Sequence, residues 1–326
     1  MTAAPTATPT SPATQRAAAF VATRMPEAEA IGTALADHIG DPDAFATALG
    51  AGFERLSDSV YRDGVQFIAP GIGTVHGVRR PLMAAVARGF RQATRSDRAT
   101  TLLFIADRLF HERHLEARWF AFGLLERTLA ADPERSWQLL RRAAREAADW
   151  VTVDDLAHPY SVGIDAEPYR WAELEQLVYS PSRWERRLIG STIATMTHGN
   201  RGTGGGPDLV PKALDLLEAL MGDAEADVQK ALAWAYRSLA HLDREATTAA
   251  LRREADIAIA DADGHRAWVV RDSLSKLAPG DAADLRARLT TIRKRPGARS
   301  TSAAARTAER FGALPDPTTH PEPPLA

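Results

Sequence analysis

The chain has 326 residues, of which 40 are basic and 42 acidic, so its formal net charge is −2. This balance excludes a protein that coats nucleic acid by bulk positive charge, although a local basic face remains compatible with it. The absence of cysteine excludes disulfides, thiolate metal sites, iron–sulfur clusters and a cysteine nucleophile. Hydrophobic residues make up 45% of the chain, enough for a globular protein with a substantial core.

The two ends of the chain differ from its interior. The stretches MTAAPTATPTSPATQ and LPDPTTHPEPPLA are rich in Pro, Thr and Ala, a composition that does not form a packed core. We therefore expect disordered tails at 1–15 and 312–326 and one folded domain at 16–311. The sequence has no apolar run of ~18 residues and no basic segment leading into an apolar one, so we expect a cytoplasmic protein without a membrane anchor.

Apolar residues recur at helical spacing in almost every segment between these tails. ARWFAFGLLERTLA and DVQKALAWAYRSLAHL, for example, place them at i, i+3, i+4 and i+7. Asp132-Pro133-Glu134 is typical of a helix start. Strand-like alternation is nearly missing, and we interpret the one doubtful stretch, 64–78, as a loop. The sequence therefore predicts an all-α fold.

Four tryptophans indicate a repeat. Trp150, Trp184, Trp234 and Trp268 are separated by 34, 50 and 34 residues, and the longer interval contains a glycine-rich run at 198–208 that we interpret as a flexible loop. A helical period in the thirties to forties is typical of helix pairs stacked as a HEAT or TPR solenoid. Because no TPR consensus is visible, we predict HEAT-like repeats.

Basic residues repeat together with these tryptophans. The last three tryptophans are each followed, three positions later, by an arginine: Arg187, Arg237 and Arg271. This spacing puts both side chains on one helix face, which Lys230, four positions before Trp234, also joins. The first tryptophan differs, because Trp150 is followed four positions later by Asp154.

Two interpretations of this face are open. The tryptophans can be core residues and the arginines can brace neighbouring helices. Alternatively, a curved solenoid can present them on a concave DNA-binding face, with guanidinium groups for phosphate and indoles for sugars or bases. The repetition favours the second interpretation.

Several motifs along the chain carry a resemblance to a known family. They lie between about Gly77 and Leu277: GVRRP (77–81), EARWFAFGLLE (116–126), WVTVD (150–154), RWERRLIGS (183–191), DVQKALAWAYRSLA (227–240) and WVVRDSLSKL (268–277). The most specific are W-x-x-x-D and Q-K-A-x-x-W-x-x-R. With these motifs in this order, the chain resembles the AlkD-type alkylpurine DNA glycosylases of the DNA alkylation repair family. The resemblance implies a HEAT-like solenoid curved around duplex DNA.

The resemblance also implies roles for individual residues. Trp150 and Asp154 match the active-site pair of the family, and Trp234 matches its second lesion-facing tryptophan. Arg187 matches an arginine that contacts phosphate beside the scissile nucleotide, and Arg237 a nearby basic residue. Lys230 and Arg271 extend this basic row, and Arg79 occupies a DNA-facing position in the family's amino-terminal repeat. The implied partner is duplex DNA containing alkylated bases, bound by a monomer without a cofactor or metal.

The chemistry that follows is hydrolysis of an N-glycosidic bond. A purine alkylated at N3 or N7 is cationic and leaves without protonation, so the enzyme's task is to stabilise an oxocarbenium-like sugar. Asp154 would supply the negative charge. Its neighbour Asp155 is the rival carboxylate, but on a helix it lies about 100° further round. Excision without a base-flipping pocket, and tolerance of bulky adducts, are further implications of the resemblance.

Other interpretations remain. Asp154 can be a helix-cap or salt-bridge carboxylate, and the chain can be a non-catalytic HEAT-like scaffold that binds DNA or a protein partner. The histidines of His111-Glu112-Arg113-His114 are three positions apart rather than the four of zinc peptidases, so we expect no metal site there. The run 293–295, Arg-Lys-Arg, can contact phosphate, but we favour a solvated helix end.

Overall fold

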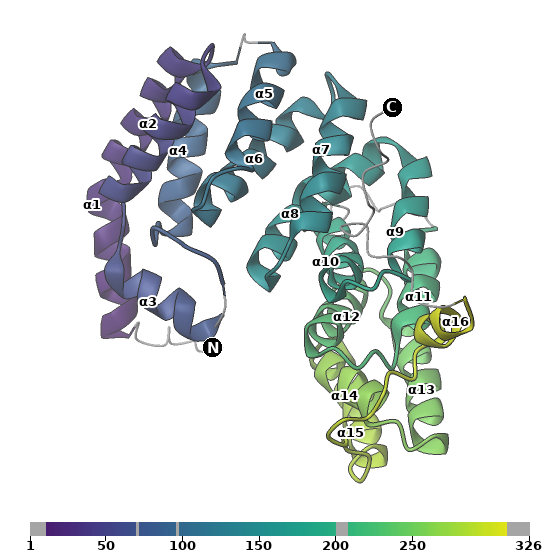
Figure 1. Cartoon of the computed structure of the whole chain (residues 1–326). Helices are drawn as coiled ribbons and strands as arrows, with labels where there is room; N and C mark the ends of the chain where they lie inside the picture. The colour runs from purple at the N-terminus through teal and green to yellow at the C-terminus, as the bar shows by residue number, and fades with distance from the viewer. Residues whose placement is uncertain (1–10, 70–71, 96–97, 200–207, 312–326) are drawn as a thin grey trace, which may run out of the picture. The chain divides into compact units, whose positions relative to one another are not determined.

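The computed structural model describes residues 11–69, 72–95, 98–199 and 208–311. Within these ranges it is built of helices, contains no strand and has two isolated β-bridges (Figure 1), which confirms the all-α prediction. No helix in this part of the chain is long and apolar enough to cross a membrane. The chain divides into two compact units, Met1–Asp132 and Pro133–Ala326.

The first unit packs its helices around a cluster of phenylalanines. Its long first helix, α1 (Pro12–Ala34), lies along α4 (Arg80–Ala93), where a Cβ at Gly32 would collide with the Val86 carbonyl, so glycine permits the close approach. Phe90 and Phe120 are among the buried rings of the cluster. The helices are α1 (Pro12–Ala34), η1 (Leu35–His38), α2 (Pro42–Arg55), α3 (Ser59–Ile68), α4 (Arg80–Ala93), α5 (Ala99–Leu109) and α6 (Leu115–Thr128).

Two sequence expectations for this unit need correction. Residues 12–15 belong to α1 rather than to a disordered tail, because the Ser11 hydroxyl caps the helix by accepting from the backbone N–H of Thr14. Residues 64–68 belong to α3 rather than to a loop, because the Asp58 carboxylate caps that helix. The remainder of the predicted loop, as far as it is described, has no helix.

The second unit is a stack of helix pairs in two layers. Helices α8, α10, α12 and α14 pack side by side in chain order and form one layer. Helices α9, α11 and α13 lie alongside this row and form the second layer (Figure 1). The helices are α7 (Pro133–Glu146), α8 (Trp150–Ala166), η2 (Pro168–Arg170), α9 (Trp171–Leu177), α10 (Arg183–Gly199), α11 (Leu209–Leu220), α12 (Ala226–Leu239), α13 (Arg244–Ala260), α14 (Gly264–Ser273), η3 (Leu274–Lys276), α15 (Pro279–Arg288) and α16 (Ala303–Phe311).

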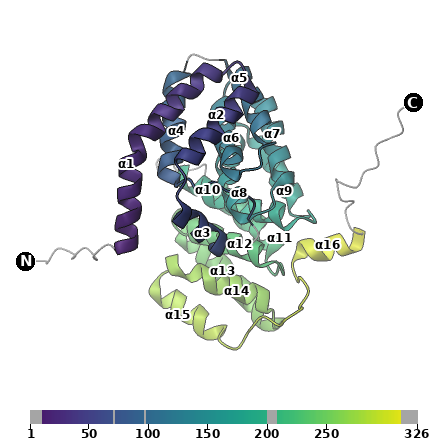
Figure 2. The ribbon, with the colours of Figure 1, turned by 60° about the vertical axis from the view of Figure 1, so that its left-hand side comes forward.

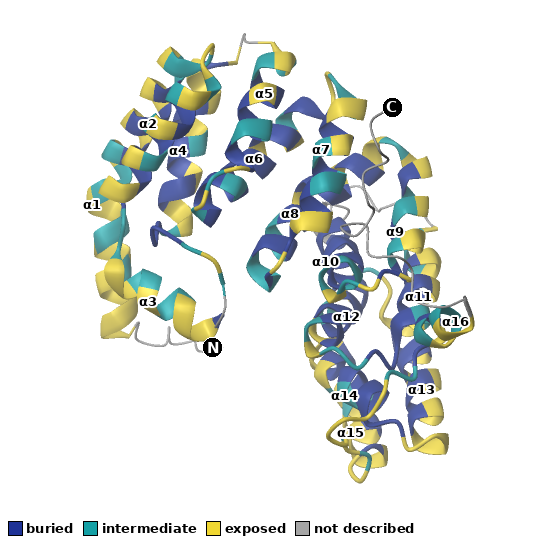
Figure 3. Cartoon of the chain, in the orientation of Figure 1, coloured by how far each residue is buried: buried dark blue, intermediate teal, exposed yellow. Residues whose placement is uncertain are grey.

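Close packing within this row depends on small residues. A Cβ at Gly190 of α10 would lie 2.7 Å from the carbonyl carbon of Ala231 in α12, so these two helices approach almost backbone to backbone. Both helices are buried along most of their length (Figure 3). The row of α8, α10, α12 and α14 is therefore a tightly packed layer. Most of the predicted glycine-rich loop at 198–208 and the predicted tail at 312–326 lie outside the described residues.

Candidate functional site

The four tryptophans of the repeat lie on the four helices of this one row. Trp150 begins α8, and the other three lie on α10, α12 and α14. All four are half-buried, as is Trp171 outside the series, whereas Trp119 and Trp137 are 9% and 3% exposed. The series therefore does not consist of ordinary core tryptophans.

Asp154 lies one turn after Trp150, and two side chains of α10 hold its carboxylate. Arg187 donates from Nε to Oδ1 at 3.1 Å and from Nη2 to Oδ2 at 2.8 Å. The Ser191 hydroxyl donates to Oδ1 at 2.7 Å. A bidentate arginine–carboxylate pair fixes orientation as well as position. The Asp154 side chain is nevertheless 22% exposed, so it is held by three hydrogen bonds and still reaches solvent.

Arg187 is itself almost fully buried and has a third partner. Its side chain is 6% exposed, and its Nη1 donates to the backbone carbonyl of Asp227, near the start of α12, at 2.7 Å. Its guanidinium carbon lies 5.9 Å from the centre of the Trp150 ring, within reach of a cation–π attraction. One side chain thus connects α8, α10 and α12.

The structure distinguishes the alternatives for Asp154. The N-cap of α8 is Asp149, whose carboxylate accepts from the Thr152 backbone N–H at 2.8 Å and the Thr152 hydroxyl at 2.7 Å. Asp154 is therefore not the helix cap, but it does form an ion pair with Arg187. Asp155 is half-buried and follows Asp154 about 100° further round α8.

The other predicted DNA-binding arginines make contacts within the protein. Arg237 donates to the Asp272 carboxylate at 2.7 Å and to its carbonyl at 2.8 Å. Arg79, which lies in the first unit, donates to the Asp58 carboxylate at 2.7 Å. Arg187 and these two arginines therefore have the bracing contacts that the first interpretation of the face describes.

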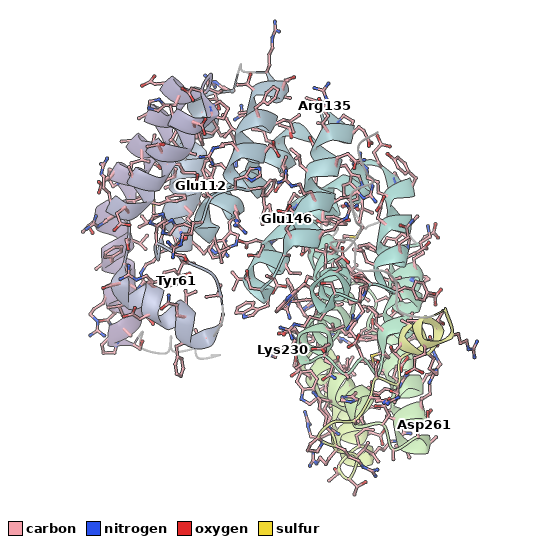
Figure 4. The ribbon with its side chains drawn as sticks, in the orientation of Figure 1. Tyr61, Glu112, Arg135, Glu146, Lys230 and Asp261 are labelled. Carbon is pink, nitrogen blue, oxygen red and sulfur yellow. The ribbon has the colours of Figure 1, made fainter. Side chains whose placement is uncertain are left out.

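The remaining predicted basic residues have no acidic partner in the described part of the chain. Lys230 is exposed and projects from α12 (Figure 4). Arg271 donates from Nη1 to the carbonyls of Leu289 and Ile292, at 2.9 and 2.8 Å. Burial and the nearby charge of Arg293 lower the pKa of Arg271. Positive charge without a counter-charge thus remains at this end of the row.

The structure brings together some of the predicted residues and adds others. Trp150, Asp154 and Arg187 meet across α8 and α10, while Trp234 is half-buried on α12, the helix that accepts the third hydrogen bond of Arg187. Ser191 is an addition to the predicted set, although its position four residues after Arg187 places it on the same helix face.

Two further sequence interpretations can be compared with the structure. The run 293–295 is not a helix end, because α15 stops at Arg288. Lys294 within it is half-buried, and its Nζ lies 4.2 Å from the centre of the Trp268 ring. Among the described residues, no group of three or more His, Asp or Glu side chains is placed to hold a metal ion.

These features define a helical-repeat protein whose packed row carries half-buried tryptophans, arginines and one partly exposed, firmly held carboxylate. Comparison with protein families gives the particular class. Residues 51–277, over two thirds of the chain, match the DNA alkylation repair enzyme family. The protein belongs to that family. No curated protein sequence shows significant similarity to the chain.

Proposed function

We propose that this protein is a DNA glycosylase that hydrolyses the N-glycosidic bond of cationic N3- or N7-alkylated purines in duplex DNA. Membership of the DNA alkylation repair enzyme family supports a damaged-DNA substrate. The observation that carries the reaction type is Asp154. Its carboxylate is oriented by three donors, its side chain is 22% exposed, and it lies one helical turn from the half-buried Trp150.

In the proposed step, the bond between C1′ and the base nitrogen is largely broken before water bonds to C1′. The bonding electron pair goes to the base, where it neutralises the positive charge of the alkylated ring, so no acid is needed. The sugar becomes oxocarbenium-like, and Asp154 stabilises it electrostatically. A water oxygen then bonds to C1′ and loses one proton to Asp154 or solvent, which leaves a neutral base and an abasic site.

The tryptophans contribute through their ring faces. Trp150 lies on the same face of α8 as the carboxylate, and a ring face attracts a positively charged sugar by a cation–π interaction worth about 0.5–2 kcal/mol. Trp234 is the second ring in this proposal. Arg187 is a positioning residue here, because all the contacts described for its guanidinium are with the protein.

The proposal is tested by base release. Duplex DNA containing 7-methylguanine is incubated with the protein, and free base is measured by chromatography, with a uracil-containing duplex as the matched neutral lesion. Release of 7-methylguanine without release of uracil is expected, because the site has no acid aimed at a neutral leaving group. Efficient uracil release, or no release of either base, contradicts the mechanism.

One observation favours a second function. Arg79, Arg187 and Arg237 are each paired with a carboxylate of the protein, as expected of a non-catalytic helical-repeat scaffold that binds DNA or a protein partner. Such a scaffold would bind DNA without releasing any base, so the same assay, combined with a binding measurement, separates the two functions.

A further inference from the structure

Part of the chain beyond the family match forms a strap over the second unit. Residues 289–302, here called the C-terminal strap, connect α15 to α16 and contain no helix (Figure 2). The family match ends at residue 277, so this segment is an addition to the family core. The strap follows the last helix pair of the stack. Any side chain that the strap places against the row of α8, α10, α12 and α14 is therefore an addition to the face formed by the repeats.

Specific contacts fix the strap at both ends. At its start, the Arg271 side chain binds two strap carbonyls, as described above. Further along, the His265 ring pairs through Nε2 with the carbonyl of Ala298 at 3.1 Å. Near its end, Thr301 donates from its backbone N–H to the carbonyl of Gly222 at 2.9 Å and from its hydroxyl to the Asp263 carboxylate. The strap is therefore a docked element with a defined path.

Gly264, the first residue of α14, allows the middle of the strap to approach. A Cβ at this position would collide with the backbone of Arg293 and Lys294, so these two residues lie directly against the helix start. Lys294 then extends across the Trp268 ring and donates to the side-chain oxygen of Gln229 on α12. The strap thus delivers a lysine onto the tryptophan face of the last two helices of the row.

This arrangement gathers four positive charges: Lys230, Arg271, Arg293 and Lys294. The pKa of Lys294 is lowered by burial and by the charges of Arg271 and Lys230, and that of Arg271 by burial and by Arg293. Within the described residues, none of the four forms an ion pair with a carboxylate, unlike Arg187 and the other paired arginines. Like charges held together cost free energy unless an anion neutralises them.

We propose that the C-terminal strap completes a phosphate-binding site for the DNA backbone, in which Arg293 and Lys294 act together with Lys230 and Arg271 around Trp268. Through Arg293 and Lys294, the site adds DNA-backbone contacts that lie outside the residues matched by the family. The inference rests on the DNA substrate of the proposed function. It selects DNA over an acidic protein because Lys230 and Arg271 lie on the same helix row as Asp154 and Trp150, and the strap adds Arg293 and Lys294 to that end of the row.

The test is binding to an undamaged duplex, measured by fluorescence anisotropy over a range of salt concentrations. Arg293→Ala and Lys294→Met each remove one charge, and methionine keeps a long apolar side chain over Trp268. Losing one phosphate contact makes the slope of log affinity against log salt shallower by about 0.9, which corresponds to about 15-fold weaker binding at about 50 mM salt and about fourfold at about 200 mM. Arg295→Ala is the matched control, because Arg295 is an exposed arginine of the same strap.

The expected result is a weaker affinity and a shallower slope for Arg293→Ala and Lys294→Met, with Arg295→Ala close to the unaltered protein. Unchanged binding in the first two variants overturns the site, as does an equal loss in all three, which would indicate bulk charge only. Arg293→Ala keeps the test valid if Lys294→Met unfolds, because no side-chain contact of Arg293 holds the strap in the described structure.

The outcomes separate this site from the proposed reaction. Strap-dependent DNA binding without release of 7-methylguanine would support the site and contradict the glycosylase. Release of 7-methylguanine by the unaltered protein, with unchanged DNA binding in the strap variants, would support the glycosylase and contradict the site.

Discussion

Replacement of Asp154 by Asn tests whether the buried pair serves catalysis or only stability. The substitution keeps the size of the side chain but removes the charge that Arg187 contacts through two hydrogen bonds. Breaking a buried ion pair costs about 3–5 kcal/mol, and because Asp154 is 22% exposed we expect about 2–3 kcal/mol. For a unit of this size, that lowers Tm by about 4–12 °C.

The expected effect on chemistry is much larger than the effect of unfolding. If the protein is stable by at least about 5 kcal/mol, the variant remains about 97% folded or better at 25 °C. Loss of one preorganised electrostatic contact lowers the rate by about 10²-fold. Single-turnover release of 7-methylguanine, measured beside thermal melts, therefore separates the two contributions. Asp155→Asn, which removes the same charge one position further along α8, is the control and should change the rate little.

The reasoning is refuted if Asp154→Asn releases base within about threefold of the unaltered protein, because a role in stabilising the sugar cation requires about 10²-fold. It is also refuted if the loss of activity merely follows the loss of folded protein as temperature is raised.

Three further predictions follow from the packing, the histidines and the leaving group. Gly190→Ala should destabilise the second unit by about 1–3 kcal/mol, because the new methyl group meets the Ala231 backbone, and a denaturant titration measures this. Burial and the neighbouring His76 lower the pKa of His114 below its ordinary value of 6.5, so the unfolded chain binds more protons and Tm should fall as pH drops below about 6.5; a Tm independent of pH in His114→Gln would identify the group. Dialysis against EDTA should leave base release unchanged, because a cationic purine leaves without a Lewis acid, and restoration of activity by added zinc or magnesium would contradict this.

Much of the repeat could be predicted because it depends on spacing along single helices. The interval between tryptophans and the three-residue step from Trp184 to Arg187 are set by helix geometry, so the sequence alone places them on one face. The partners across helices could not be predicted in the same way. Arg187 and Asp154 are 33 residues apart. Their contact depends on the position of α10 along the axis of α8, which side-chain packing between the two helices determines.

The strap shows a different limit of sequence interpretation. The run 293–295 has the composition of a solvated helix end, and nothing local indicates that Lys294 crosses an indole. Its position depends on Gly264, about thirty residues earlier in the chain, which leaves room for the strap backbone. The absence of a side chain at one distant position, which makes room for the strap, produces no periodic pattern in the sequence.

The three hydrogen bonds of Arg187 have a consequence for engineering this protein. Repeat proteins can often be shortened, extended or recombined one repeat at a time, since each repeat contacts only its neighbours. Here a single guanidinium binds Asp154 of α8 and the Asp227 carbonyl of α12 from its own position on α10. The segment from α8 to α12 would therefore have to be grafted as one block for the carboxylate to keep its orientation.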